Sequence, residues 1–113
     1  MSKRRVDQSL ARVALLFAAL GDETRLTLLN RLSHGGPASI TVLAESFDLT
    51  RQGVTKHLQV LAGAGIIAGR REGREHVWAL NAARLTEAVR CLDSIGRRWD
   101  DALSRLKLHV EKG

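Results

Sequence analysis

The sequence predicts a mainly α-helical fold with one small β-hairpin. Over most of the 113 residues, apolar side chains recur at steps of three and four, the spacing of an amphipathic helix. Between residues 66 and 80 the spacing changes to two, which is typical of strands. The length, with 44% hydrophobic and 27% charged residues, fits one globular unit, so we expect residues 1–113 to form a single domain.

Charge and cysteine content restrict the partners. Lys and Arg number 18 against 12 Asp and Glu, a net charge of +6, which favours a negatively charged partner, nucleic acid before an anionic membrane. The only cysteine, Cys91, cannot form an intramolecular disulfide, which fits a reducing, cytoplasmic location. The sequence holds no apolar run near the roughly 20 residues that span a bilayer and no recognisable secretory signal, so we expect no membrane partner.

Two helices follow a basic start. Residues 1–8 predict a flexible basic arm, and Gly21 ends the first helix. The apolar stripe of that helix is Leu10, Val13, Phe17 and Leu20. Asp22 is a good N-cap for the second helix, which the Gly-Gly-Pro run at residues 35–37 terminates. The stripe expected to be buried on the second helix is Leu26, Leu29 and Leu32.

Residues 39–65 predict two short helices joined by a tight turn. Ser39 and Thr50 are good N-caps for these helices, and Asp48 lies in the connection between them. We expect the first to bury Leu43, Ala44 and Phe47, and the second, ending at Gly65, to bury Val54, Leu58 and Leu61. This order is that of a helix-turn-helix. The exposed face of its second helix is predicted to be polar and basic, with Arg51, Gln52, Thr55, Lys56 and His57.

A β-hairpin, or wing, is predicted for residues 66–80. One strand covers residues 66–71, Glu72 and Gly73 form a tight turn, and residues 74–80 return. The tip of this hairpin carries several arginines and is expected to be positively charged.

The last predicted helix covers residues 82–110 and is capped by Asn81. Its apolar residues alternate at steps of four and three: Leu85, Val89, Leu92, Gly96, Trp99, Leu103, Leu106 and Val110. A monomer can offer only its first helix to cover them, so we expect a homodimer through the first and last helices. The expected interface residues are Leu10, Val13, Phe17, Leu85, Leu92, Trp99, Leu103 and Leu106.

Two stretches carry a family resemblance. "ALGDETRLTLLNRL" at residues 19–32 and "LAESFDLTRQGVTKHLQVLAGAGIIAGRREGREHVWAL" at residues 43–80 resemble the ArsR/SmtB winged-helix repressors. With the flanking helices, the resemblance covers roughly residues 8–110. It implies a winged helix-turn-helix fold and a homodimeric DNA-binding transcriptional regulator, usually a repressor.

The motifs of the metal-sensing members are missing. Residues 39–48, where such members carry a Cys-x-Cys element, contain neither Cys nor His, and Asp93 is not followed by an Asp-x-His pattern. We therefore expect no metal site and no cofactor. Asp48 stands where the family usually has Gly, which is tolerable because Asp adopts the left-handed conformation more readily than most residues. Cys91 is interpreted as a half-buried small apolar residue, the alternative being a thiol pair across the dimer.

The residues expected to contact DNA lie on the helix-turn-helix and the wing. Gln52 can read adenine, Arg51 or Lys56 can read guanine, and the arginines of the wing suit phosphates or the minor groove. Gly53 allows a close approach, and His57 either donates to a phosphate at the edge of this face or is a buried histidine bonded to the backbone. The full expected set is Ser39, Thr50, Arg51, Gln52, Gly53, Thr55, Lys56, His57, Arg70, Arg71 and Arg74.

These observations predict a sequence-specific regulator that binds double-stranded DNA at a pseudo-palindromic operator, with recognition helices about one DNA turn apart. The alternative is a sequence-independent architectural or protein-interaction module. An enzyme is the weakest interpretation, because the sequence shows no nucleophile arrangement, paired-acid spacing or Gly-rich phosphate loop.

Overall fold

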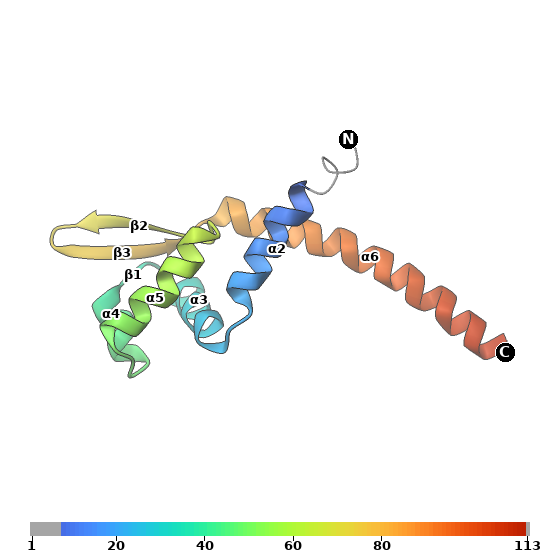
Figure 1. Cartoon of the computed structure of the whole chain (residues 1–113), viewed down its shortest axis with the longest axis horizontal. Coiled ribbons are helices and arrows are strands. Elements are labelled where there is room, and N and C mark those ends of the chain that lie inside the picture. The colour runs from blue at the N-terminus through green and yellow to red at the C-terminus, as the bar shows by residue number, and fades with distance from the viewer. Residues whose placement is uncertain (1–7, 113) are drawn as a thin grey trace.

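The computed structural model describes residues 8–112, and within them it is mainly helical with a small sheet (Figure 1). The elements run in the order α2 (Gln8–Leu20), α3 (Glu23–Gly35), β1 (Ala38–Ser39), α4 (Ile40–Ser46), α5 (Arg51–Gly63), β2 (Ile67–Glu72), β3 (Glu75–Leu80) and α6 (Ala82–Lys112). The predicted fold class of helices with one hairpin is therefore confirmed. The expected basic arm lies outside the described residues, except that position 8 is already the first residue of α2.

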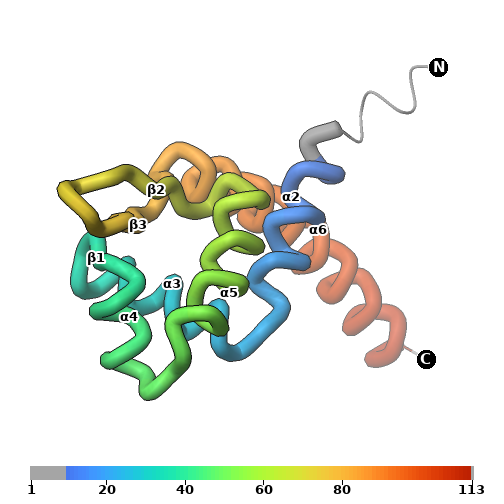
Figure 2. Tube along the Cα trace, turned by 60° about the vertical axis from the view of Figure 1, so that its left-hand side comes forward, coloured from blue at the N-terminus to red at the C-terminus, as the bar shows by residue number. Residues whose placement is uncertain are grey.

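The core gathers around α5, with α2 on one side and α4 on the other (Figure 2). Its largest fully buried side chains are Leu16, Leu28, Leu43, Val54, Leu58, Leu61 and Ile66. Truncating a leucine at such a position to alanine typically costs about 2–5 kcal/mol. One predicted stripe is wrong: α3 buries Leu28 and Leu32, whereas Leu26 is exposed. Both stripes obey helical spacing, and the contacts of α3 with α2 and α5 decide which one faces inward.

The predicted helix caps are present. The side-chain oxygens of Asp22, Ser39 and Thr50 accept hydrogen bonds from the backbone N–H groups three residues later, at 3.0, 3.2 and 3.0 Å. Asp48 has a φ of 52°, the left-handed conformation expected of it between α4 and α5. Helix α5 ends at Gly63, two residues before the predicted end at Gly65.

The sheet has the strand order β1-β3-β2 and contains one strand that the sequence did not indicate. The wing strands pair with Glu72 opposite Glu75, so the turn consists of Gly73 and Arg74, one residue later than predicted. Gly73 has a φ of 64°, which a glycine adopts without strain. The extra strand β1 adds two residues, Ala38 and Ser39, that pair with Trp78 and Val77 of β3. It is too short for an alternating pattern to be visible.

A histidine ring fills the space above a glycine in the wing. His76 stacks on Trp78 with ring centroids 4.5 Å apart and planes 10° from parallel. Gly69 pairs with Trp78 across the strands, and a Cβ at Gly69 would lie 2.3 Å from Nε2 of His76. The stack therefore requires a residue without a side chain at position 69.

The first half of α6 packs on α2, and its second half projects away from the body (Figure 1). Glu87 of α6 is paired with Arg12 of α2 at 2.7 Å and with Arg84 at 3.1 Å. The projecting stripe stays exposed at Leu92, Trp99, Leu103, Leu106 and Val110. Val13, expected at a dimer interface, is instead only 3% exposed, because α2 turns it inward. Phe17 and Leu85, also expected there, pack partly against the core.

We predict that Asp22→Ala lowers the melting temperature by a few degrees at neutral pH, and that this deficit shrinks in acid. The Arg25 backbone N–H that donates to the Asp22 carboxylate lowers its pKa below 3.8; burial opposes this, and the charges of Arg25 and His57 lower the pKa further. Because the folded-state pKa is lowered, the stabilisation is complete above the ordinary value and is lost as the pH falls through the lowered one.

Thermal melts of the wild type and Asp22→Ala over a pH series test this expectation. Asp22→Asn is the control, because its amide oxygen still caps α3 but carries no charge. A melting-temperature deficit in Asp22→Ala that is as large in acid as at neutral pH would contradict the role of the carboxylate.

Candidate nucleic-acid interface

The exposed face of α5 carries the polar residues expected to meet DNA. Val54, Leu58 and Leu61 turn the opposite face of this helix into the core. Arg51, Gln52, Lys56 and Gln59 are exposed. Gln59 was not among the residues expected from the sequence, although it follows Lys56 by three residues and Gln52 by seven, a spacing that places all three on one face. Three polar side chains thus lie side by side along the outer surface of α5.

Two small residues at the start of α5 have local roles. Thr50 caps the helix by accepting from the backbone N–H of Gly53, and a Cβ at Gly53 would lie 3.0 Å from the Thr50 hydroxyl oxygen. The glycine therefore leaves room for the cap, a reason that the sequence alone did not reveal. Thr55 donates its hydroxyl proton to the Arg51 carbonyl at 2.7 Å, which leaves only the acceptor capacity of that hydroxyl to a ligand.

Two other expected site residues are half-buried at the margins. His57 lies about 140° around the helix from Gln52, and its Nδ1 is 3.8 Å from the Asp22 carboxylate at the start of α3. It therefore borders the body of the protein rather than the centre of the exposed face. Ser39 ends β1 and caps α4.

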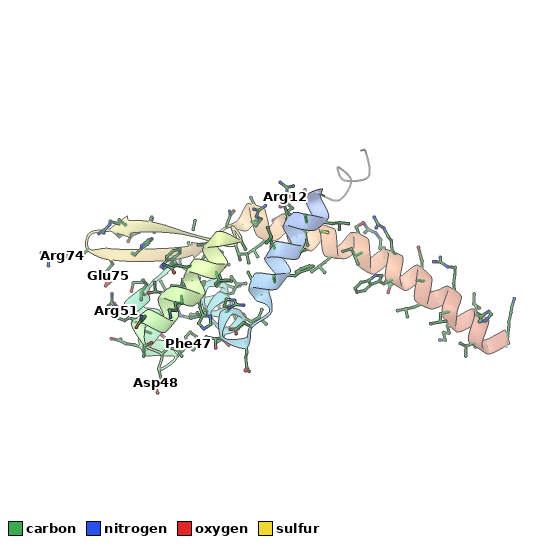
Figure 3. All side chains as sticks on the ribbon, viewed as in Figure 1. Arg12, Phe47, Asp48, Arg51, Arg74 and Glu75 are labelled. Carbon is green, nitrogen blue, oxygen red and sulfur yellow. The ribbon has the colours of Figure 1, made fainter. Side chains whose placement is uncertain are left out.

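A chain of hydrogen bonds joins the helix-turn-helix to the wing. Arg51 donates through Nη1 to the hydroxyl oxygen of Thr41 at 2.6 Å, and Thr41 donates to a carboxylate oxygen of Glu75 at 3.3 Å. Figure 3 shows Arg51 and Glu75 on the same side of the molecule, near the tip that carries Arg74. No pattern in the sequence points to Thr41, because its place depends on the pairing of β1 with β3.

The wing divides its arginines into one paired and two unpaired side chains. Arg70 forms an ion pair with Glu72 at 2.5 Å, whereas Arg71 and Arg74 are exposed and form no ion pair within residues 8–112. From residue 51 to residue 76 the chain has five Lys or Arg against two Glu, a surplus of 5 − 2 = +3. A surface of this kind attracts the phosphate backbone of nucleic acid.

The described part of the chain contains neither a metal-binding cluster nor a membrane-spanning helix. Residues 8–112 bring together no group of three or more His, Cys, Asp or Glu side chains that could hold a metal ion. Among these residues, no helix combines the length and the apolar character needed to cross a bilayer.

The fold and its basic face define a DNA-binding protein of the helix-turn-helix class. A family model described as a helix-turn-helix domain matches residues 20–70. The HTH-type transcriptional regulator Rv2034 of Mycobacterium tuberculosis is 35% identical over 86 residues, which cover 76% of this chain and 77% of the relative. The arsenical resistance operon repressor of Escherichia coli is 31% identical over 67% of this chain and 71% of its own length.

A solved structure agrees with these relatives. The ArsR-like transcriptional regulator from Rhodococcus sp. RHA1 superposes with a TM-score of 0.75 at 35% identity, covering 88% of this chain and 92% of that one. The chain belongs to the ArsR family of winged helix-turn-helix transcriptional regulators. It is thus a DNA-binding regulator of transcription, as the resemblance of its motifs implied.

We predict that the double substitution Arg71→Ala with Arg74→Ala weakens binding to all DNA sequences alike. Removing one phosphate contact should make the slope of log affinity against log salt shallower by about 0.9. Titrations of labelled duplexes at several salt concentrations measure both quantities. Arg97→Ala with Arg105→Ala removes the same charge from the exposed surface of α6 and is the control. A fall in affinity for one particular sequence only would show that the wing reads bases.

Proposed function

We propose that this regulator is a homodimeric repressor that acts in the cytoplasm on a pseudo-palindromic operator. The observation that carries the proposal is the single surface formed by the exposed face of α5 and the unpaired arginines of the wing. The proposal includes no metal ion or cofactor, because the chain lacks both sequence patterns of the metal-sensing members. Repression is supported by the E. coli relative, which is a repressor by name.

In this proposal the amino-terminal turns of α5 enter the major groove. Gln52 reads adenine, and Arg51 or Lys56 reads guanine through N7 and O6. Thr55 offers an acceptor to the same groove, and the glycine at position 53 lets the helix approach closely.

Phosphate contacts surround these base contacts. The backbone near the caps Ser39 and Thr50 faces one strand, and Arg70, Arg71 and Arg74 follow the backbone from the wing. Nδ1 of His57 faces Asp22, so Nε2, on the other side of the ring, is its donor to a phosphate at that margin.

The dimer is proposed from the uncovered stripe of α6. Helix α6 has 31 residues, which corresponds to about 46 Å at 1.5 Å per residue, and α2 packs only on its first half. Apolar side chains at steps of four and three along the remainder suit a second copy of the same helix related by a two-fold axis. Leu10, 43% exposed on α2, lies at the margin of that surface and completes the proposed interface.

Selection of bound fragments from a genomic DNA pool, followed by footprinting, tests the proposal. We expect a small set of fragments that share an inverted repeat whose halves lie on one side of the duplex. Salt-sensitive binding without any preferred sequence would instead support the architectural alternative.

Gln52→Ala should remove discrimination at one base pair of each half-site, worth about 1–3 kcal/mol. Affinities for the selected operator and for a scrambled duplex of equal length provide the comparison. We expect the first to fall and the second to stay nearly constant. An equal fall on both would mean that Gln52 contacts the backbone and that the exposed face of α5 does not read sequence.

Leu103→Asp should dissociate the dimer, raising its dissociation constant at least tenfold, because it places a charge in an apolar interface. Leu108→Asp is a matched control: the two leucines are 60% and 59% exposed, but they lie about 140° apart around α6. Sedimentation equilibrium at several concentrations measures the constant. Equal effects of the two substitutions would place the interface elsewhere.

A further inference from the structure

We infer that Thr41 and Glu75 are positioning residues that aim Arg51 at bases, so that they determine sequence discrimination rather than affinity. The inference rests on the proposed function, in which α5 reads the major groove. The three side chains come from three elements: Thr41 from α4, Arg51 from the first turn of α5 and Glu75 from the first residue of β3.

The direction of each hydrogen bond in this chain is fixed by chemistry. A guanidinium can only donate and an ionised carboxylate can only accept. The Thr41 hydroxyl, which lies 2.6 Å from Nη1 of Arg51 and 3.3 Å from Oε1 of Glu75, must therefore accept from the first and donate to the second. No direct ion pair joins Arg51 to Glu75 in the described residues, so the hydroxyl is the connection between them.

Glu75 stands in an unfavourable position for a residue that serves only the wing. Its cross-strand partner is Glu72, and like charges placed directly opposite one another destabilise a hairpin. Arg70 neutralises Glu72, whereas the hydrogen-bond partner of Glu75 is Thr41. A carboxylate on a DNA-facing surface also repels phosphates, so Glu75 lowers affinity for every DNA sequence. A benefit must therefore come from its link to Arg51.

The benefit that fits this geometry is preorganisation. Arginine is a long side chain that loses much rotamer freedom when it is fixed, and fixing it before binding reduces the loss on binding. An untethered Arg51 at the first turn of α5 can swing to the nearest phosphate in any duplex. When Thr41 holds one edge of the guanidinium, the remaining donors keep one direction and can form a paired contact with a guanine.

The experiment compares four variants on the selected operator and on a scrambled duplex at several salt concentrations. Glu75→Gln breaks the link and removes one negative charge. Glu72→Gln, the matched control, removes one negative charge from the paired position of the same hairpin and leaves Thr41 linked. Thr41→Val breaks the link without changing charge, and Thr41→Ser restores a hydroxyl.

Both glutamate variants should bind the scrambled duplex more tightly and to a similar degree, because both remove the same repulsion. Only Glu75→Gln and Thr41→Val should reduce the ratio of operator to scrambled affinity, by about tenfold, the discrimination of one paired base contact. Thr41→Ser should keep the wild-type ratio. Far-ultraviolet circular dichroism and melting temperatures show whether each variant folds.

Two results would overturn the inference: an unchanged ratio in Thr41→Val, or indistinguishable ratios in Glu75→Gln and Glu72→Gln. These results are separate from failure of the proposed function. In that case the wild type itself would show no preference for any sequence, and both conclusions would fall together.

Discussion

The pairing of β1 with β3 sets the geometry on which the DNA-facing surface depends. Ala38 pairs with Trp78 and Ser39 pairs with Val77, and Ser39 also caps α4. The strand therefore ends where the helix begins, with no linker between them. Because Trp78 is buried, a slip of β3 would turn this large ring to solvent. The wing and the helix-turn-helix consequently move as one unit, and the arginines of the wing keep their place beside α5.

Features that depend on a few neighbouring residues could be predicted from the sequence. The oxygens of Asp22, Ser39 and Thr50 cap helices wherever the chain continues with helix-forming residues, so the starts of α3, α4 and α5 followed directly. The left-handed Asp48 is a property of its own side chain and the short connection. The polar surface of α5 followed from the spacing of Val54, Leu58 and Leu61, because these three residues fix which side faces the core.

Features that depend on distant partners could not be predicted. Leu26 and Leu28 are chemically identical, and only the packing of α3 against its neighbours selects Leu28 for the core. The predicted turn at Glu72 and Gly73 would place Trp78 opposite Ile67. The observed register places it opposite Gly69, where the His76 ring has room to stack on the indole. The role of Thr41 has the same origin, because a hydroxyl two residues beyond β1 meets the wing only after the sheet has formed.

Helix α6 connects the reading surface to the rest of a dimer. Only its first turns are anchored in the protomer, by the buried Ala88 and the partly buried Leu85, and the distal half projects. In the proposed dimer, the spacing of the two α5 helices is therefore set by how the two α6 helices pack, not by contacts inside either body. Two linked reading surfaces bind a duplex far more tightly than one, but only when their separation matches the repeat of the DNA helix. A signal that shifts the α6 pairing would therefore release the operator while leaving every DNA-contacting side chain unchanged.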